Sequence, residues 1–176
     1  MFLFIYFKVI PRLKFLGVYG KYEGCWIEII PDFPRSISIC RIYYKDGEYH
    51  FDGTNYGLDN HDPVKFQSQK IVVSEKDEFF YISKSNQQHL PVGFGKVYCI
   101  SNSNGEYYTA NGYFVDVCST GDSTMHNTKM IKFEEKFYNS FLVLKPGENP
   151  KKFTDKEIYD HVKDYIKSKY KTECNL

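Results

Sequence analysis

The sequence predicts a mainly β protein, namely a small closed antiparallel β-barrel of about eight strands, calycin-like in outline, with a C-terminal α-helix. Between Tyr22 and Phe133, short β-rich runs alternate with turn clusters at the spacing of an all-β barrel or sandwich. The chain also holds 16 Tyr and 15 Phe, which suit strands better than helical bundles or disordered segments. A Gly-x-Trp motif at Gly24 and Trp26, the only tryptophan, opens the first run. We expect Gly24 to allow a close backbone approach and Trp26 to plug one end of the barrel interior.

Each expected strand is a run rich in β-branched and aromatic residues that ends at a turn. The dipeptides Asp46-Gly47 and Asn104-Gly105 predict two-residue hairpins, because both central positions of a type I′ turn need a positive φ. In chain order, the expected strands are residues 22–30, 36–44, 48–56, 64–74, 79–84, 93–100, 106–117 and 127–133.

The pattern changes after Phe133. Residues 134–144 are compatible with a short helix, and residues 145–150, which include two prolines and a glycine, predict a linker. Thr154 and Glu157 form a capping box, and apolar residues then recur at helical spacing, which predicts a helix from residue 155 to about 170. The chain therefore divides into a leader (residues 1–20), a barrel (21–133) and a C-terminal helical segment (134–176).

Composition limits the classes of partner. A chain of 176 residues favours one compact domain with appendages. Its 23 Lys and Arg against 22 Asp and Glu leave a net charge of +1, so no bulk field is present to hold a DNA or RNA polymer, although a small anionic ligand is compatible. The five cysteines are odd in number and form no C-x-x-C pair, which is typical of reduced, cytosolic thiols.

The leader begins with seven apolar residues, 1–7, followed by Lys8, Arg12 and Lys14. Spanning a bilayer takes about 20 residues, so this run cannot span alone. It has two interpretations. Either it folds onto the barrel, or it is the end of a membrane helix whose upstream part is absent here, with the basic residues at the cytoplasmic boundary.

No catalytic or metal-binding pattern is visible in the sequence. The chain has no G-x-S-x-G elbow, no metal-ligand spacing among its five histidines, and no phosphate-binding loop. No carboxylate pair stands beside a base in sequence. We therefore expect a protein that is not an enzyme, with no catalytic residue, no metal and no cofactor.

Two strands carry candidate ligand-binding residues. In the second expected strand, Arg41 and Tyr43 share a face with Ile37 and Ile39, so Arg41 either points into the barrel mouth or that face is not the interior. A guanidinium suits phosphate, and a tyrosine two residues on suits stacking against a base. In the seventh strand, Tyr113 is placed where a ligand could reach it, with core packing as the alternative.

The segment 119–131 adds hydroxyls, an amide and an ammonium near a strand start. Such groups suit phosphate and sugar, although a solvated hairpin loop explains them as well. Strand alternation does not decide whether Thr128 or Lys129 faces inward. The full set of candidate ligand-binding residues is Trp26, Arg41, Tyr43, Tyr113, Thr128 and Lys129.

The apolar leader, the basic stretch Pro11-Arg12-Leu13-Lys14 and the motif Gly20-Lys21-Tyr22-Glu23-Gly24-Cys25-Trp26 precede a β-rich domain. Together they resemble the SMODS-associated two-transmembrane, β-strand-rich effectors of bacterial cyclic-oligonucleotide antiphage defence (CBASS), over roughly residues 1–133. The resemblance implies two N-terminal membrane helices and a cytoplasmic eight-stranded barrel that binds a cyclic dinucleotide. It also implies that ligand binding promotes oligomerisation and membrane damage. This chain departs from the family because it holds at most the last seven residues of one membrane helix.

The function expected from these observations is a cyclic-dinucleotide-binding sensor barrel of an antiphage defence effector. Its expected partners are the nucleotide, further copies of the chain and, through the N-terminal segment, a membrane. The expected location is the cytoplasmic face of the inner membrane if the missing helices exist, and otherwise the cytoplasm. The alternatives are a calycin-like barrel that binds an apolar small molecule, and an interaction module that needs no ligand.

Overall fold

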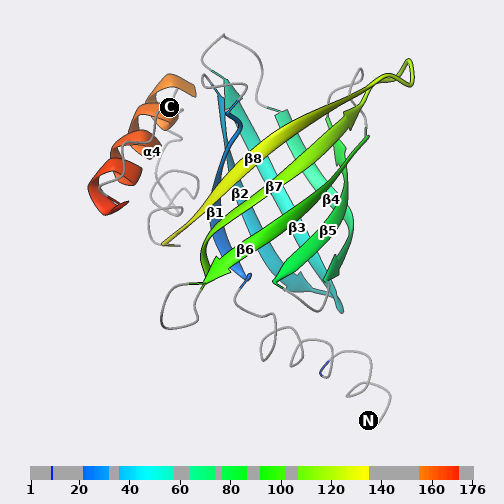
Figure 1. The fold of residues 1–176 in the computed structure, drawn as a ribbon, viewed down its shortest axis with the longest axis horizontal. Coiled ribbons are helices and arrows are strands. Elements are labelled where there is room, and N and C mark those ends of the chain that lie inside the picture. The colour runs from blue at the N-terminus through cyan, green and yellow to red at the C-terminus, as the bar shows by residue number, and fades with distance from the viewer. Residues whose placement is uncertain are drawn as a thin grey trace, which may run out of the picture.

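A computed structural model describes residues 9, 22–31, 36–57, 64–73, 77–86, 92–101, 107–134 and 155–170 of the chain. Within them, eight antiparallel strands form one closed barrel in chain order, and β1 pairs with β8 to close it (Figure 1). The predicted fold class is confirmed. The strands are β1 (Gly24–Ile29), β2 (Ser36–Lys45), β3 (Glu48–Gly57), β4 (Val64–Val73), β5 (Glu78–Ser85), β6 (Val92–Ser101), β7 (Tyr107–Val117) and β8 (Ser123–Phe133).

The inner face of the barrel is packed in one half by apolar and aromatic side chains. Trp26 is fully buried and its Nε1 donates to the carbonyl oxygen of Tyr22 at 2.8 Å. The ring of Phe51 contacts that of Tyr81 edge to face, with centroids 4.8 Å apart. The other buried members of this core are Cys40, Ile42, Phe79, Val97, Cys99, Ala110 and Met130.

Two glycines make room for rings that cross the interior. A Cβ at Gly53 would lie 2.4 Å from the ring of Phe66, and one at Gly95 would lie 2.6 Å from the ring of Tyr81. Contacts of a real Cβ atom are essentially never this short. A residue larger than glycine at either position would therefore need the space that the ring occupies. An eight-stranded barrel is just wide enough for side chains to fill, and these glycines let it hold large aromatics.

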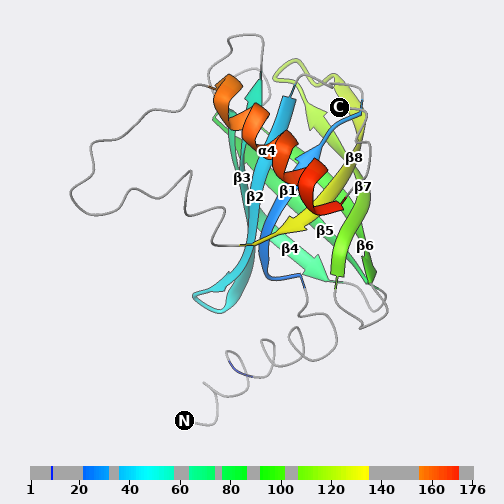
Figure 2. The same cartoon turned by 90° about the vertical axis from the view of Figure 1, so that its left-hand side faces the viewer.

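The outer face of β1 and β2 is buried too. Helix α4 (Asp155–Tyr170) lies along this side of the barrel, as Figure 2 shows. Its Val162 is 2% exposed, and Tyr165 packs edge to face on Phe133 at the end of β8. The barrel wall under the helix is apolar, with the outward side chains of Cys25, Ile27, Ile29, Ile37, Ile39 and Ile131 all buried. Strands β1 and β2 are therefore buried on both faces over most of their length.

Most strand boundaries agree with the sequence within one or two residues, and the helix over residues 155–170 is confirmed. The Asp46-Gly47 turn is also confirmed, with φ of 52° and 94°. Strand β8 begins at Ser123, four residues earlier than expected, because it pairs with β7 as far as Val117. The Asn104-Gly105 turn, all of the helix expected at 134–144 except Glu134, Thr154 and nearly all of the leader lie outside the described residues. Among the described residues, no helix is long and apolar enough to cross a membrane.

A polar half of the barrel interior

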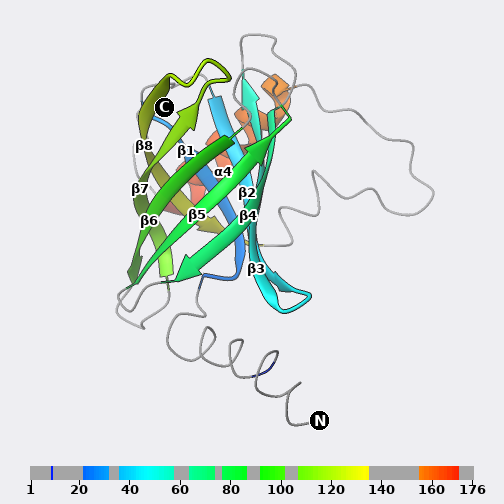
Figure 3. The same cartoon turned by 90° about the vertical axis from the view of Figure 1, so that its right-hand side faces the viewer.

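The inner face becomes polar towards the end of the barrel where β1, β3, β5 and β7 finish. The polar side chains at this end lie on the same face as the packed core. Each of them is an even number of residues along its strand from a residue of that core. They come from six strands, which the closed barrel brings around one axis (Figure 3). These residues are Glu28, Ser38, Asn55, Ser83, Asp116, His126 and Thr128, and the buried Ser68 on β4, opposite Ser83, also faces inward.

Glu28 is the centre of this group. Its side chain is enclosed by the barrel, and the residue is only 4% exposed. The hydroxyl of Thr128 donates to Glu28 Oε1 at 2.9 Å, and Asn55 Nδ2 donates to Ser38 Oγ at 3.0 Å. Burial raises the pKa of Glu28, while hydrogen bonds to Thr128 and Ser38 oppose that shift. The fold therefore keeps an ionisable carboxyl inside a ring of short polar side chains.

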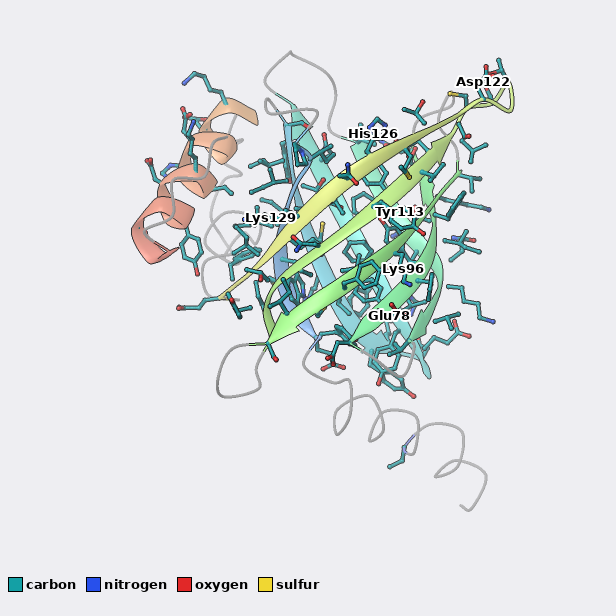
Figure 4. The ribbon with its side chains drawn as sticks, viewed as in Figure 1. Glu78, Lys96, Tyr113, Asp122, His126 and Lys129 are labelled. Atoms are coloured by element: carbon teal, nitrogen blue, oxygen red, sulfur yellow. The ribbon has the colours of Figure 1, made fainter. Side chains whose placement is uncertain are left out.

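Asp116 supplies a second inward carboxyl, on β7. Burial raises its pKa, and the neighbouring His126 on β8 opposes the shift (Figure 4). A Cβ at Gly93 would lie 3.2 Å from Ser83 Oγ and 3.3 Å from Asp116 Oδ1, so these two oxygens converge on the glycine. The imidazole ring of His126 also lies against Phe114, with ring centroids 5.1 Å apart. The polar half thus contains two carboxyls on different strands.

Cys40 and Tyr81 lie where the polar and packed halves meet. Burial raises the pKa of the Cys40 thiol and of the Tyr81 hydroxyl well above their usual values. Cys40 Sγ lies 4.0 Å from Glu28 Oε2, and as a protonated thiol it acts as a weak donor. A thiol is nucleophilic only as its thiolate, so burial makes Cys40 a hydrogen-bonding group and not a nucleophile. None of the four described cysteines forms a disulfide: Cys25, Cys40, Cys99 and Cys118.

Two of the six predicted site residues face the barrel interior, in different halves of it. Trp26 lies in the packed half, and Thr128 lies in the polar half, where its hydroxyl donates to Glu28. Tyr113 and Lys129 face outward, because Phe114 packs towards the interior and Thr128 is buried in it. Sequence alternation left the choice between Thr128 and Lys129 open, and Thr128 is the inward one.

The prediction that Arg41 and Tyr43 point into the barrel mouth is wrong. The face that they share with Ile37 and Ile39 is the outer face of the barrel, which was the other possibility stated for it. Cys40 and Ile42 face inward, so Arg41 is exposed on the outside. Its guanidinium carbon lies 5.9 Å from the centroid of the Tyr43 ring, and the Tyr43 hydroxyl donates to Asp52 Oδ2 at 2.5 Å. The apolar residues that share this face, Ile37 and Ile39, are buried on the outer side of the wall.

The loop that precedes β8 is a hairpin tip outside the interior. The backbone N–H of Cys118 donates to the carbonyl of Asp122 at 2.7 Å, and Gly121 has a φ of 93°. The hydroxyl of Thr120 donates to Asp122 Oδ2 at 2.9 Å. The Thr120 hydroxyl therefore stabilises a solvated turn, which was the alternative stated for this segment.

Sequence reasoning missed Glu28, Asp116, Ser38, Asn55 and His126. A signal for Glu28 was present. It is the one charged residue in the apolar run of β1 and lies two positions after Trp26, so the period of two puts both on one face. The other four residues come from strands β2, β3, β7 and β8, and only the register of the barrel brings them together.

No protein-family model matches the chain, and no curated protein is significantly similar to it. In the part of the chain that the structure describes, no three His, Cys, Asp or Glu side chains are grouped to hold a metal ion. The functional argument therefore depends on the barrel and on the chemistry of its inner face.

Proposed function

We propose that the barrel is a nucleotide-binding sensor module, in which the polar half of the interior receives a base of a small nucleotide such as a cyclic dinucleotide. The observation that carries this proposal is the enclosed carboxyl of Glu28, held at its Oε1 by Thr128 at 2.9 Å. A buried ionisable group is costly unless it is hydrogen-bonded. Such groups concentrate at sites that bind or react.

The residues around Glu28 match the edge of a base. A nucleobase presents N–H donors and acceptors side by side, and a carboxylate with two oxygens accepts from adjacent N–H groups. Thr128, Ser38 and Asn55 can each donate as well as accept, so they suit mixed edges. Guanine, whose edge offers two neighbouring N–H groups, fits an ionised Glu28 best.

The phosphates of such a ligand stay outside the polar half. No Lys or Arg occupies an inward position there among the described residues, and both carboxyls disfavour a second negative charge. We therefore place only a base inside the barrel. Arg41 and Lys129, which were predicted to hold phosphates, occupy outward positions on the barrel wall.

The alternative of an apolar ligand has less support from the packing. The aromatic half of the interior, which would receive such a ligand, is occupied by rings that contact one another. A ligand-free interaction module remains the competing interpretation, and it makes the polar half a purely structural network.

The wider role is part of the same proposal and depends on the family resemblance in the sequence. In that role, the sensor belongs to a bacterial antiphage effector, and binding of the nucleotide promotes oligomerisation of the chain and damage to a membrane. It requires that a nucleotide binds first. The binding test below therefore comes before any test of defence.

The decisive measurement is isothermal titration calorimetry of the full chain against a panel of cyclic di- and trinucleotides. We expect saturable binding by one member. Glu28→Gln should weaken it by roughly 10- to 100-fold, because removing one partner of a buried charged hydrogen bond costs about 1.5–3 kcal/mol. Arg41→Gln and Lys129→Gln are matched controls that remove outer-face charges, and they should leave the affinity within about twofold.

The opposite pattern would contradict the proposal. Binding that is lost in Arg41→Gln and retained in Glu28→Gln places the ligand on the outer face. Absence of heat with every member, from a folded wild-type protein, leaves the ligand-free interpretation. The near-ultraviolet circular dichroism of buried Trp26 reports whether each variant retains the packed core.

A further inference from the structure

A contiguous group of apolar side chains is exposed on the side of the barrel away from α4. They occupy outward positions on β4, β5, β6 and β8, and each is between 36% and 63% exposed. Cross-strand pairing makes them neighbours: Val72 lies opposite Phe80, and Ile82 lies opposite Phe94. We call this group the apolar band; its members are Val72, Phe80, Ile82, Val92, Phe94, Tyr98, Ile100 and Met125.

The apolar band is large for a protein surface. A large aromatic side chain has a surface of roughly 150–250 Å², so the exposed parts of the apolar band add up to on the order of 500 Å². This area is at the upper end for the largest apolar patch on a monomer. The half-buried Val115 on β7 joins the band, because it lies between Phe94 and Met125 in the register. A patch of this size is often functional.

The charges on this side of the barrel are strongly one-sided. The outward positions of β4 to β6 hold four lysines and one glutamate, in a chain whose net charge is only +1. Figure 4 shows Lys96 and Glu78 near one another, and the Lys96 Nζ and Glu78 Oε2 atoms are 2.9 Å apart. A surface that docks on this side must therefore accept both apolar groups and positive charge. The lysines are Lys65, Lys70, Lys84 and Lys96.

We propose that the apolar band and its lysines form a docking face for an anionic lipid surface. Aliphatic and aromatic side chains enter the boundary between headgroups and acyl chains, while lysines beside them reach lipid phosphates. Each lysine near an acidic membrane contributes a factor of roughly five in binding. This contact is independent of the ligand site, which lies inside the barrel.

Two other partners fit the same face less well. Single-stranded nucleic acid needs free ring faces for stacking, but the Lys96 ammonium lies 4.7 Å from the Phe80 centroid and 4.5 Å from the Tyr98 centroid. A second copy docked by a two-fold axis would bring two lysine-rich faces together, and like charges disfavour that contact.

Vesicle co-sedimentation of the full chain tests the proposal. We expect binding to phosphatidylcholine vesicles that contain phosphatidylglycerol, weaker binding to phosphatidylcholine alone, and a fall with added salt. The variant Ile82→Thr/Phe94→Thr keeps strand propensity and removes apolar area, and Lys70→Gln/Lys84→Gln removes two charges. Each should lower the partition coefficient at least tenfold.

The matched control is Arg41→Gln/Lys45→Gln, which removes two exposed charges from β2 and should leave partitioning within about twofold. Three results would overturn the proposal. They are no binding to acidic vesicles, equal binding by the band and control variants, and a concentration-dependent dimer that Ile82→Thr/Phe94→Thr abolishes in light scattering. Retained Trp26 circular dichroism in each variant separates lost docking from lost folding.

Discussion

Glu28 is a buried, inward-facing carboxyl whose position its sequence context conceals. It stands in a strand that is buried throughout, where the expected residue is apolar. Alternation after Trp26 places it inward, and only the three-dimensional register shows that Thr128 and Ser38 satisfy it. The error at Arg41 has the same origin. Because β1 and β2 are buried on both faces, the apolar pattern of Ile37 and Ile39 does not tell the inner face from the outer one.

The first residue-scale prediction concerns pH. The pKa of Glu28 and the pKa of Asp116 are both raised by burial, from ordinary values of 4.5 and 3.8. A carboxyl whose folded pKa is raised binds more protons in the folded state, so its favourable contribution is full at low pH. That contribution is lost as the pH rises through the folded pKa.

We therefore expect the denaturation midpoint of the wild type to fall as the pH increases above about 4.5, the value at which an unperturbed Glu ionises. Glu28→Gln should flatten this dependence, because an amide does not ionise. Urea unfolding followed by tryptophan fluorescence at a series of pH values measures it. A steeper dependence in the variant would mean that Glu28 is not the titrating group.

The second residue-scale prediction concerns the glycine beneath Tyr81. In Gly95→Ala, the new Cβ would lie 2.6 Å from the Tyr81 ring, which packs on Phe51 and cannot move freely. We expect a loss of about 1–3 kcal/mol in unfolding free energy, as for other overpacked cores. Gly93→Ala in the same strand, whose nearest atoms would be 3.2 Å away, should cost less. Equal losses in the two variants would argue against a ring clash.

At the scale of elements, α4 explains why the barrel wall is unequal. The wall beneath it is apolar on its outer face, while the opposite wall carries the apolar band and its lysines. The helix attaches through Val162 and through Tyr165, whose hydroxyl accepts from the backbone N–H of Glu134 at 3.4 Å. The helical spacing of apolar residues predicted α4, and the runs of β-branched and aromatic residues predicted the strands, because both signals are local in the sequence. Which wall the helix covers depends on tertiary packing and was not predictable.

The element-scale prediction is that α4 can be released while the barrel stays folded. Val162→Asp places a charge at a position that is 2% exposed, which opposes docking. Backbone hydrogen exchange should then increase in α4 and in β1 and β2, whose outer face the helix covers. The near-ultraviolet circular dichroism of Trp26 should stay unchanged. Asp164→Ala, at an exposed position of the same helix, is the control. Global unfolding by Val162→Asp would show that helix and barrel fold as one unit.

At the scale of the whole molecule, the barrel closes on itself through β1 and β8, so no sheet edge is left among the described strands. The sequence predicted this closed architecture because the run and turn spacing of eight strands repeats along the chain. It did not predict which residues gather on each face. The inner polar group joins residues about 100 positions apart, such as Glu28 and Thr128, and the lysines beside the apolar band come from three strands.

The division of the interior into a packed half and a polar half has an evolutionary consequence. The aromatic side chains that hold the barrel together are different residues from the short polar ones that would recognise a ligand. Ser38, Asn55 and Thr128 can therefore be exchanged for other small polar residues with little effect on the packed core. Under the proposed function, a lineage built on this scaffold can change what it recognises while its packed core stays the same.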